Sequence, residues 1–195
     1  MARATSTMLE LGTKAPTFKL PNTNADVGSS TVTFSDYADM SNVLVMFICN
    51  HCPYVVHIRT DLVNFVKEYQ NKGVGVIAIS SNDATNFPGD SPFRMQLEAA
   101  QHGYSFPYLY DEDQTVAKAY QAICTPDFYL FDANRTLVYR GQFDGSRPNN
   151  RVPISGVDLR AACDAVLLNQ SVSQQQYPSV GCSIKWKFGN EPDYY

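Results

Sequence analysis

The sequence contains no long hydrophobic segment. No run approaches the roughly 20 consecutive apolar residues that a membrane-spanning helix needs. The first 16 residues, MARATSTMLELGTKAP, also lack the apolar core and the cleavage pattern of a secretory signal. We therefore expect a cytoplasmic protein without a membrane partner.

Basic clusters are missing as well. The 15 Lys and Arg residues and the 19 Asp and Glu residues give a net charge of −4 and form no basic block, which argues against a nucleic-acid partner. There is no internal repeat and no low-complexity segment. A chain of 195 residues can bury a core without a disulfide framework. We predict one domain at residues 1–168 and a C-terminal extension packed on it at residues 169–195.

Cysteines are few, and most of them are isolated. There are five, an odd number that leaves at least one unpaired within the chain and fits a reducing compartment. Cys49 and Cys52 are separated by two residues, whereas Cys124, Cys163 and Cys182 are single. A structural zinc site normally has four ligands, and the sequence has no second CxxC pair and no HxxxH. A non-catalytic zinc-binding module is one alternative, but we expect no metal and no bound cofactor.

The Cys49–Cys52 pair lies between a predicted strand and a predicted helix. Val43–Ile48 is a continuous apolar run, typical of a central strand covered on both faces. Apolar residues then recur at helical spacing as far as Tyr69, and Val74–Ser80 is a second apolar run. Strand, helix and strand at this spacing predict a βαβ unit with two parallel strands.

This position suits a reactive thiol. A helix N-terminus stabilises negative charge, and the thiolate is the nucleophile of thiol–disulfide exchange. We predict that Cys49, nearer the exposed loop, attacks a disulfide. Cys52, one turn inside the helix, would be the more buried residue that resolves the mixed disulfide. His51 between them would lower a thiol pKa and raise the reduction potential; a solvated loop histidine is the alternative.

The rest of the pattern predicts an α/β fold. Residues 1–14 read as a loose arm. The further expected elements are an N-terminal hairpin of strands 15–20 and 31–34, helices at 91–101, 115–120 and 157–168, and a second hairpin of strands 127–131 and 137–141. This order gives a central mixed β-sheet flanked by helices on both faces. With the thiol pair after the first strand of the βαβ unit, it resembles the thioredoxin fold over residues 10–168.

Several motifs narrow the resemblance. Four motifs resemble those of one branch of the thioredoxin-like superfamily. They are Leu11–Phe18 (LGTKAPTF), the CxxC, Tyr110–Tyr120 (YDEDQTVAKAY), and Thr125-Pro126 with its following hairpin. That branch contains the alkyl hydroperoxide reductase/thiol-specific antioxidant (AhpC/TSA, peroxiredoxin) proteins and the TlpA-like thioredoxins. Thr125-Pro126 is similar to the cis-proline element that faces the CxxC in such proteins. The resemblance implies a substrate groove in which the Thr125 backbone pairs with an incoming chain and Pro126 shields the thiols.

The same resemblance raises a second alternative, a thiol-dependent peroxidase with an antioxidant role. Peroxiredoxins use a Pro-x-x-x-Thr/Ser-x-x-Cys motif whose hydroxyl positions the peroxide. Aligned on Cys52, the motif needs Thr or Ser at 49 and Pro at 45, where this chain has Cys49 and Val45. Aligned on Cys49, it needs them at 46 and 42, where the chain has Met46 and Asn42. Both alignments fail, so the leading prediction is a thioredoxin-like dithiol–disulfide oxidoreductase with a redox-active disulfide.

Two of the single cysteines are candidates for a third thiol. Cys124 precedes Pro126 by two residues and either points toward the site or packs as a small buried residue. Cys182 lies in the aromatic and basic segment Gly181–Lys187 and either folds back as a redox thiol or anchors the tail. The expected partners are a disulfide-containing protein or a small disulfide, and a thiol that donates electrons.

Overall fold

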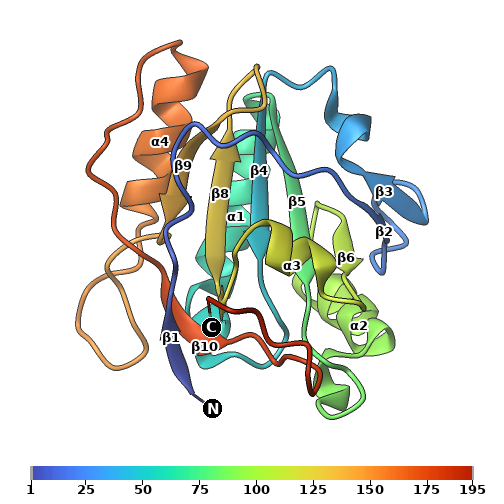
Figure 1. Ribbon diagram of the computed structural model, residues 1–195. Coiled ribbons are helices and arrows are strands. Elements are labelled where there is room, and N and C mark those ends of the chain that lie inside the picture. The colour runs from blue at the N-terminus through green and yellow to red at the C-terminus, as the bar shows by residue number, and fades with distance from the viewer. Residues whose placement is uncertain (1, 195) are drawn as a thin grey trace.

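The computed structural model describes residues 2–194 and shows a β-sheet with helices on both faces (Figure 1). The central sheet has five strands in the order β6-β5-β4-β8-β9. Their bounds are β4 (Asn42–Phe47), β5 (Val74–Ser80), β6 (Tyr108–Tyr110), β8 (Asp127–Phe131) and β9 (Leu137–Gly141). The predicted α/β class with a central mixed sheet is confirmed.

Strand directions within the sheet follow the chain connections. β4 and β5 are parallel and joined by helix α1 (Pro53–Asn71), and β5 and β6 are also parallel. β8 is antiparallel to both β4 and β9. Both the predicted βαβ unit and the predicted second hairpin are therefore present. A helical crossover suits parallel neighbours and a short turn suits antiparallel ones.

Alternate residues of β4 divide between two hydrophobic cores. Leu44, Met46 and Ile48 join the cluster that includes residues of α1, α2 (Pro92–His102) and α4 (Val157–Leu167). Val43, Val45 and Phe47 join the cluster on the other face, which includes residues of α3 (Thr115–Ala119) and the N-terminal hairpin. Successive strand side chains point to opposite faces, so a strand covered on both sides needs the continuous apolar run seen in the sequence.

The helix boundaries are encoded locally. α1 begins at Pro53 with Cys52 as its N-cap, and α2 begins at Pro92 after Ser91. Proline suits the first helical position because no intrahelical partner is lost there. Gly103 ends α2 with φ +63°, a left-handed conformation that costs glycine little. Two short 3₁₀ turns, η1 (Phe34–Tyr37) and η2 (Pro88–Asp90), complete the helical elements within residues 2–194.

The N-terminal segments only partly match expectation. The predicted first hairpin exists, formed by β2 (Lys19–Pro21) and β3 (Thr31–Thr33), although β2 is shorter than the strand predicted there. The predicted loose arm is wrong in part, because Arg3–Thr5 forms strand β1. A three-residue strand held by backbone hydrogen bonds leaves no apolar pattern to recognise.

The C-terminal tail supplies the partner of β1. Val180–Ser183 forms strand β10, which lies between β1 and β7 (Cys124–Thr125) and is antiparallel to both. Figure 1 shows the N- and C-terminal ends at the same end of the central sheet, with β10 beside them. β10 also packs against α1. The predicted domain division at residue 168 stays a prediction.

None of the helices between residues 2 and 194 is both long enough and apolar enough to span a bilayer.

Candidate redox-active site

The two thiols lie at the end of β4. Cys49 follows the strand and Cys52 is the N-cap of α1, so the helix begins after Cys52 and not one turn before it. Cys49 is only 3% exposed and Cys52 is completely buried. Cys49 is thus buried although the next two residues, Asn50 and His51, are partly exposed. The chain turns inward after β4, and both sulfurs belong to the hydrophobic core on the α1 face.

Electrostatics distinguish the two thiols. A hydrogen bond from Cys49, with further donors in Cys182 and the Val55 N–H, lowers the pKa of Cys52 to about 5 despite its burial. The same hydrogen bond, together with burial and the Asp90 charge, raises the pKa of Cys49 well above its usual value. The neighbouring Cys49 thiol, assisted by the Val55 N–H of the first helical turn, therefore favours the thiolate form of Cys52.

The Thr125-Pro126 element lies against both sulfurs. The Thr125 hydroxyl is 3.3 Å from Cys49 Sγ, and the Thr125 carbonyl oxygen is 3.1 Å from Cys52 Sγ, where a protonated Cys52 donates to it. The Thr125-Pro126 peptide bond is cis. The structure thus brings together two parts of the sequence that are more than 70 residues apart. It also places a threonine hydroxyl, supplied by β7, beside Cys49.

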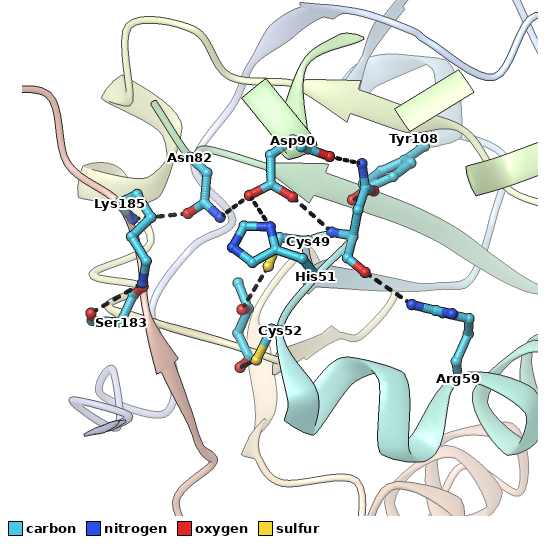
Figure 2. Close-up of polar contacts among 12 residues, drawn as sticks. Cys49, His51, Cys52, Arg59, Asn82, Asp90, Tyr108, Ser183 and Lys185 are labelled. Carbon is cyan, nitrogen blue, oxygen red and sulfur yellow. Dashed lines mark hydrogen bonds and ion pairs between the residues drawn. The ribbon is translucent and has the colours of Figure 1, made fainter. Parts of the chain in front are cut away.

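His51 belongs to a second polar group that adjoins Cys49. Its Nδ1 atom lies 2.9 Å from Oδ2 of Asp90, a carboxylate with no exposed surface (Figure 2). Asp90 also accepts hydrogen bonds from the backbone N–H of Asn50 at 2.9 Å and from Nδ2 of Asn82 at 2.7 Å. Two hydrogen bonds and the contact with His51 therefore satisfy this buried carboxylate. The imidazole is therefore held in place between the two cysteines.

Sequence reasoning missed the residues that support this loop. Besides Asp90 and Asn82, Arg59 donates to the Asn50 carbonyl at 2.9 Å, and the Tyr108 hydroxyl donates to Asn50 Oδ1 at 3.0 Å. The predicted βαβ unit could have indicated Asp90 and Asn82. Because β4 and β5 are parallel, their carboxyl ends meet at one edge of the sheet, so the loop 81–90 after β5 must lie beside the thiols.

The single cysteines differ in their distance from the site. Cys182 lies directly opposite Thr125 in the β10–β7 pairing, and burial together with the Cys52 thiol raises its pKa to about 12. Cys124 is buried with its sulfur 4.0 Å from the Ser179 carbonyl oxygen, and burial raises its pKa well above the usual value. Cys163 is buried in α4, and burial likewise raises its pKa. All five cysteines are unbonded thiols.

A possible metal-ligand group overlaps the site. Cys49, His51 and Asp90 each offer a ligand atom within 4.8 Å of the others, the one such group of three found in residues 2–194. Sulfur, imidazole nitrogen and carboxylate oxygen are donors that suit zinc. The group contains one of the two cysteines that sequence analysis singled out.

Two buried cysteines at a helix N-terminus, with Thr125 against both sulfurs, form a site of the thioredoxin-like class. The model of the AhpC/TSA family matches residues 11–140, and the chain belongs to this family.

Solved structures show the same fold. An uncharacterized conserved protein from Geobacillus kaustophilus is 50% identical, with 96% of this chain and 97% of that chain covered at a TM-score of 0.92. A hypothetical protein from Sinorhizobium meliloti 1021 is 48% identical. The match covers 95% of this chain and 99% of that chain, with a TM-score of 0.91. A putative thiol:disulfide interchange protein DsbE from Chlorobium tepidum is 23% identical. The match covers 82% of this chain and 99% of that chain, with a TM-score of 0.61. The predicted thioredoxin fold is confirmed. No curated protein matches the chain.

Proposed function

We propose that this protein is a thiol–disulfide oxidoreductase whose redox centre is the Cys49–Cys52 dithiol. One observation carries the proposal, namely that a single residue, Thr125, contacts both sulfurs, Cys49 through its hydroxyl at 3.3 Å and Cys52 through its carbonyl oxygen at 3.1 Å. Two sulfurs held against one residue can form a disulfide with little movement of the chain. A thiolate beside a thiol is also the arrangement that thiol–disulfide exchange uses.

The reaction divides into two exchanges. Cys49, the slightly more exposed sulfur, attacks a substrate disulfide, forms a mixed disulfide and releases the first substrate thiolate. The Cys52 thiolate then attacks the Cys49 sulfur, forms the Cys49–Cys52 disulfide and releases the second substrate thiolate. Two electrons pass from the dithiol to the substrate, and a thiol donor returns them in a later cycle. Cys52 suits the resolving step because Cys182 and the Val55 N–H, which remain after Cys49 has reacted, also lower its pKa.

His51 tunes the attacking thiol in this scheme. The Asp90 charge raises the pKa of Cys49 and so disfavours the Cys49 thiolate. A protonated His51, paired with Asp90 at 2.9 Å, offsets that charge.

Burial favours a small disulfide as the substrate. Cys49 and Thr125 are each 3% exposed, and β10 already pairs with the Thr125 backbone. A folded protein substrate cannot reach Cys49 while β10 is in place. Thr125 and Pro126 would then border the small disulfide at the sulfur, since the Thr125 hydroxyl is 3.3 Å from Cys49 Sγ.

The test measures exchange with a small disulfide. Protein reduced with dithiothreitol is mixed with oxidised glutathione, and loss of thiols and the resulting disulfide are followed by alkylation and mass spectrometry. We expect a Cys49–Cys52 disulfide in the wild type and a rate lowered by at least about tenfold in Cys49→Ser and Cys52→Ser. Cys163→Ser, remote from the site, is the matched control. Wild-type rates in both site variants would refute the proposal.

A peroxidase is the second candidate, favoured by the Thr125 hydroxyl at 3.3 Å from Cys49 Sγ. The peroxiredoxin motif also uses a hydroxyl beside its cysteine, and hydrogen peroxide is small enough for a buried thiol. Rapid, saturable consumption of hydrogen peroxide with a thiol donor would support this candidate. Oxidation no faster than that of free cysteine would remove it.

The zinc alternative is tested on the same samples. The Cys49, His51 and Asp90 group offers three donors, fewer than a closed structural site needs. Protein purified without added metal is analysed for zinc before and after reduction. Stoichiometric zinc that blocks alkylation of Cys49 would favour the zinc-binding module over the oxidoreductase.

A further inference from the structure

The C-terminal strand β10 covers the Thr125 backbone next to the dithiol. Cys182 lies opposite Thr125 and Ser183 lies opposite Cys124. The approach is close at Gly181, where an added Cβ would lie 1.9 Å from the Thr125 carbonyl oxygen. A glycine is therefore required at this position, and the tail strand fits this edge without room for a larger residue.

Three cysteine sulfurs surround Thr125. Cys49 contacts its hydroxyl, Cys52 contacts its carbonyl oxygen, and Cys182 is its partner across the strand pair. Cys49 and Cys182 both act on the pKa of Cys52, so Cys52 is the neighbour that the two other thiols share. All three belong to one buried cluster, and Cys182 is 5% exposed. Cys52 is therefore the sulfur that either neighbour can reach.

We propose that Cys182 is a third redox thiol, which takes over the disulfide from Cys49. The inference rests on the proposed function, because it begins from the Cys49–Cys52 disulfide. The Cys182 sulfur attacks Cys52, so that the Cys52–Cys182 bond forms while the Cys49–Cys52 bond breaks. Cys49 leaves with the electron pair of that bond, and the proton lost by Cys182 is replaced at Cys49. No electron enters or leaves the protein in this step.

The surroundings of Cys182 support attack after the first disulfide has formed. In the reduced protein, burial and then the Cys52 sulfur raise the pKa of Cys182 to about 12, while the Lys185 charge opposes them. Oxidation of Cys52 removes its negative charge and its hydrogen bond with Cys182. The Lys185 ammonium, which donates to the Ser183 carbonyl beside Cys182, then favours the Cys182 thiolate.

The exchange would change what the oxidised protein can do. Cys49 becomes a free thiol again and can react with a second molecule of substrate. The new disulfide ties β10 to the start of α1. Cys124 does not fit this role, because its sulfur is directed to the Ser179 carbonyl oxygen.

The experiment maps disulfides after oxidation by two electrons. Reduced full-length protein is treated with one equivalent of diamide, quenched with N-ethylmaleimide and digested for mass spectrometry. In the wild type we expect a Cys52–Cys182 disulfide in a population whose Cys49 carries maleimide. Cys49→Ser should form Cys52–Cys182 alone, and Cys182→Ser should form only Cys49–Cys52. Maleimide labelling of Cys49 in oxidised Cys182→Ser should fall at least about tenfold.

Cys163→Ser is the matched control and should give the wild-type disulfides. Near-UV circular dichroism checks folding, and Cys182→Ala replaces Cys182→Ser if serine disturbs the strand. If Cys49–Cys52 forms while Cys182 stays fully labelled in both the wild type and Cys49→Ser, the third-thiol inference is overturned and the proposed function stands. If diamide forms no disulfide at Cys49 or Cys52, both fail.

Discussion

His51 Nδ1 lies 2.9 Å from Oδ2 of Asp90, and the Asp90 carboxylate is completely buried while the imidazole is about one-third exposed (35%). The pair sets the charge next to Cys49, since Asp90 alone raises the pKa of that thiol. A positively charged ring cancels part of this effect. Replacing His51 or Asp90 alone distinguishes the effects of the two side chains on Cys49.

Replacing His51 should make Cys49 less reactive, whereas replacing Asp90 should make it more reactive. His51→Ala leaves the Asp90 charge without its ion-pair partner, so less Cys49 thiolate is present near pH 7. We expect alkylation of Cys49 by iodoacetamide to slow by about three- to tenfold, the effect of up to one pKa unit. Asp90→Asn should accelerate it. Equal slowing in both variants would mean that the pair acts only by holding the loop. His57→Ala, elsewhere on α1, is the control.

Cys52 should make the stability of the reduced protein rise with pH. Its pKa is about 5 in the folded protein and near 9.0 ordinarily. Between these values the unfolded state binds more protons, so the free energy of unfolding increases with pH. Below pH 5 this contribution is lost. Urea denaturation at pH 5.5, 7.0 and 8.5 should show a steeper increase for the wild type than for Cys52→Ser, and identical slopes would contradict the lowered pKa.

Gly181→Ala should displace β10 from β7. The new methyl group would overlap the Thr125 carbonyl oxygen, and such overpacking costs about 1–3 kcal/mol. We expect a lower urea midpoint and faster alkylation of both Cys52 and Cys182, because the covering strand moves away. Gly145→Ala is the matched control, since its nearest neighbour would be Val152 at 4.0 Å. Unchanged thiol protection in the destabilised variant would show that β10 does not shield the site.

Asp127 should contribute a pH dependence of the opposite sign. It is completely buried, and burial raises its pKa to about 6 from 3.8. Between these values the folded state binds more protons, so this contribution to the free energy of unfolding falls as pH rises. Asp127→Asn should therefore be more stable relative to the wild type at pH 6.5 than at pH 4.5. Urea midpoints at both values test this, with Asp61→Asn on α1 as the control. If the urea midpoints of Asp127→Asn and the wild type differ by the same amount at both pH values, the raised pKa of Asp127 is contradicted.

The sequence predicted the elements that carry strong periodic signals. The apolar runs of β4 and β5 and the helical spacing of α1 define the βαβ unit, and the CxxC at its first junction locates the dithiol. Thr125-Pro126 was matched through a family resemblance, and its contacts with both sulfurs confirm that the two motifs meet.

The terminal strands, the buried Asp90 and the thiol pKa values could not be predicted from the sequence. They depend on contacts that leave no local sequence pattern. Arg3–Thr5 and Val180–Ser183 are short strands whose pairing is made by backbone groups. Asp90 lies in a polar loop and becomes a buried carboxylate only because β4 and β5 end side by side. The order of the thiol pKa values depends first on the interaction between the two cysteines and on the burial of Cys49, which a spacing of two residues does not determine.

Because β10 pairs with Thr125, any peptide that binds at that edge of β7 must compete with β10. The tail is part of the same chain, so it competes as a tethered ligand whose effective concentration is on the order of millimolar. A free peptide of similar sequence would have to bind far more tightly than the tail, or be present at a comparable concentration, to replace it. Selection among substrates would then depend on how readily the protein releases its own strand, and removing residues 180–195 would broaden the range of disulfides accepted.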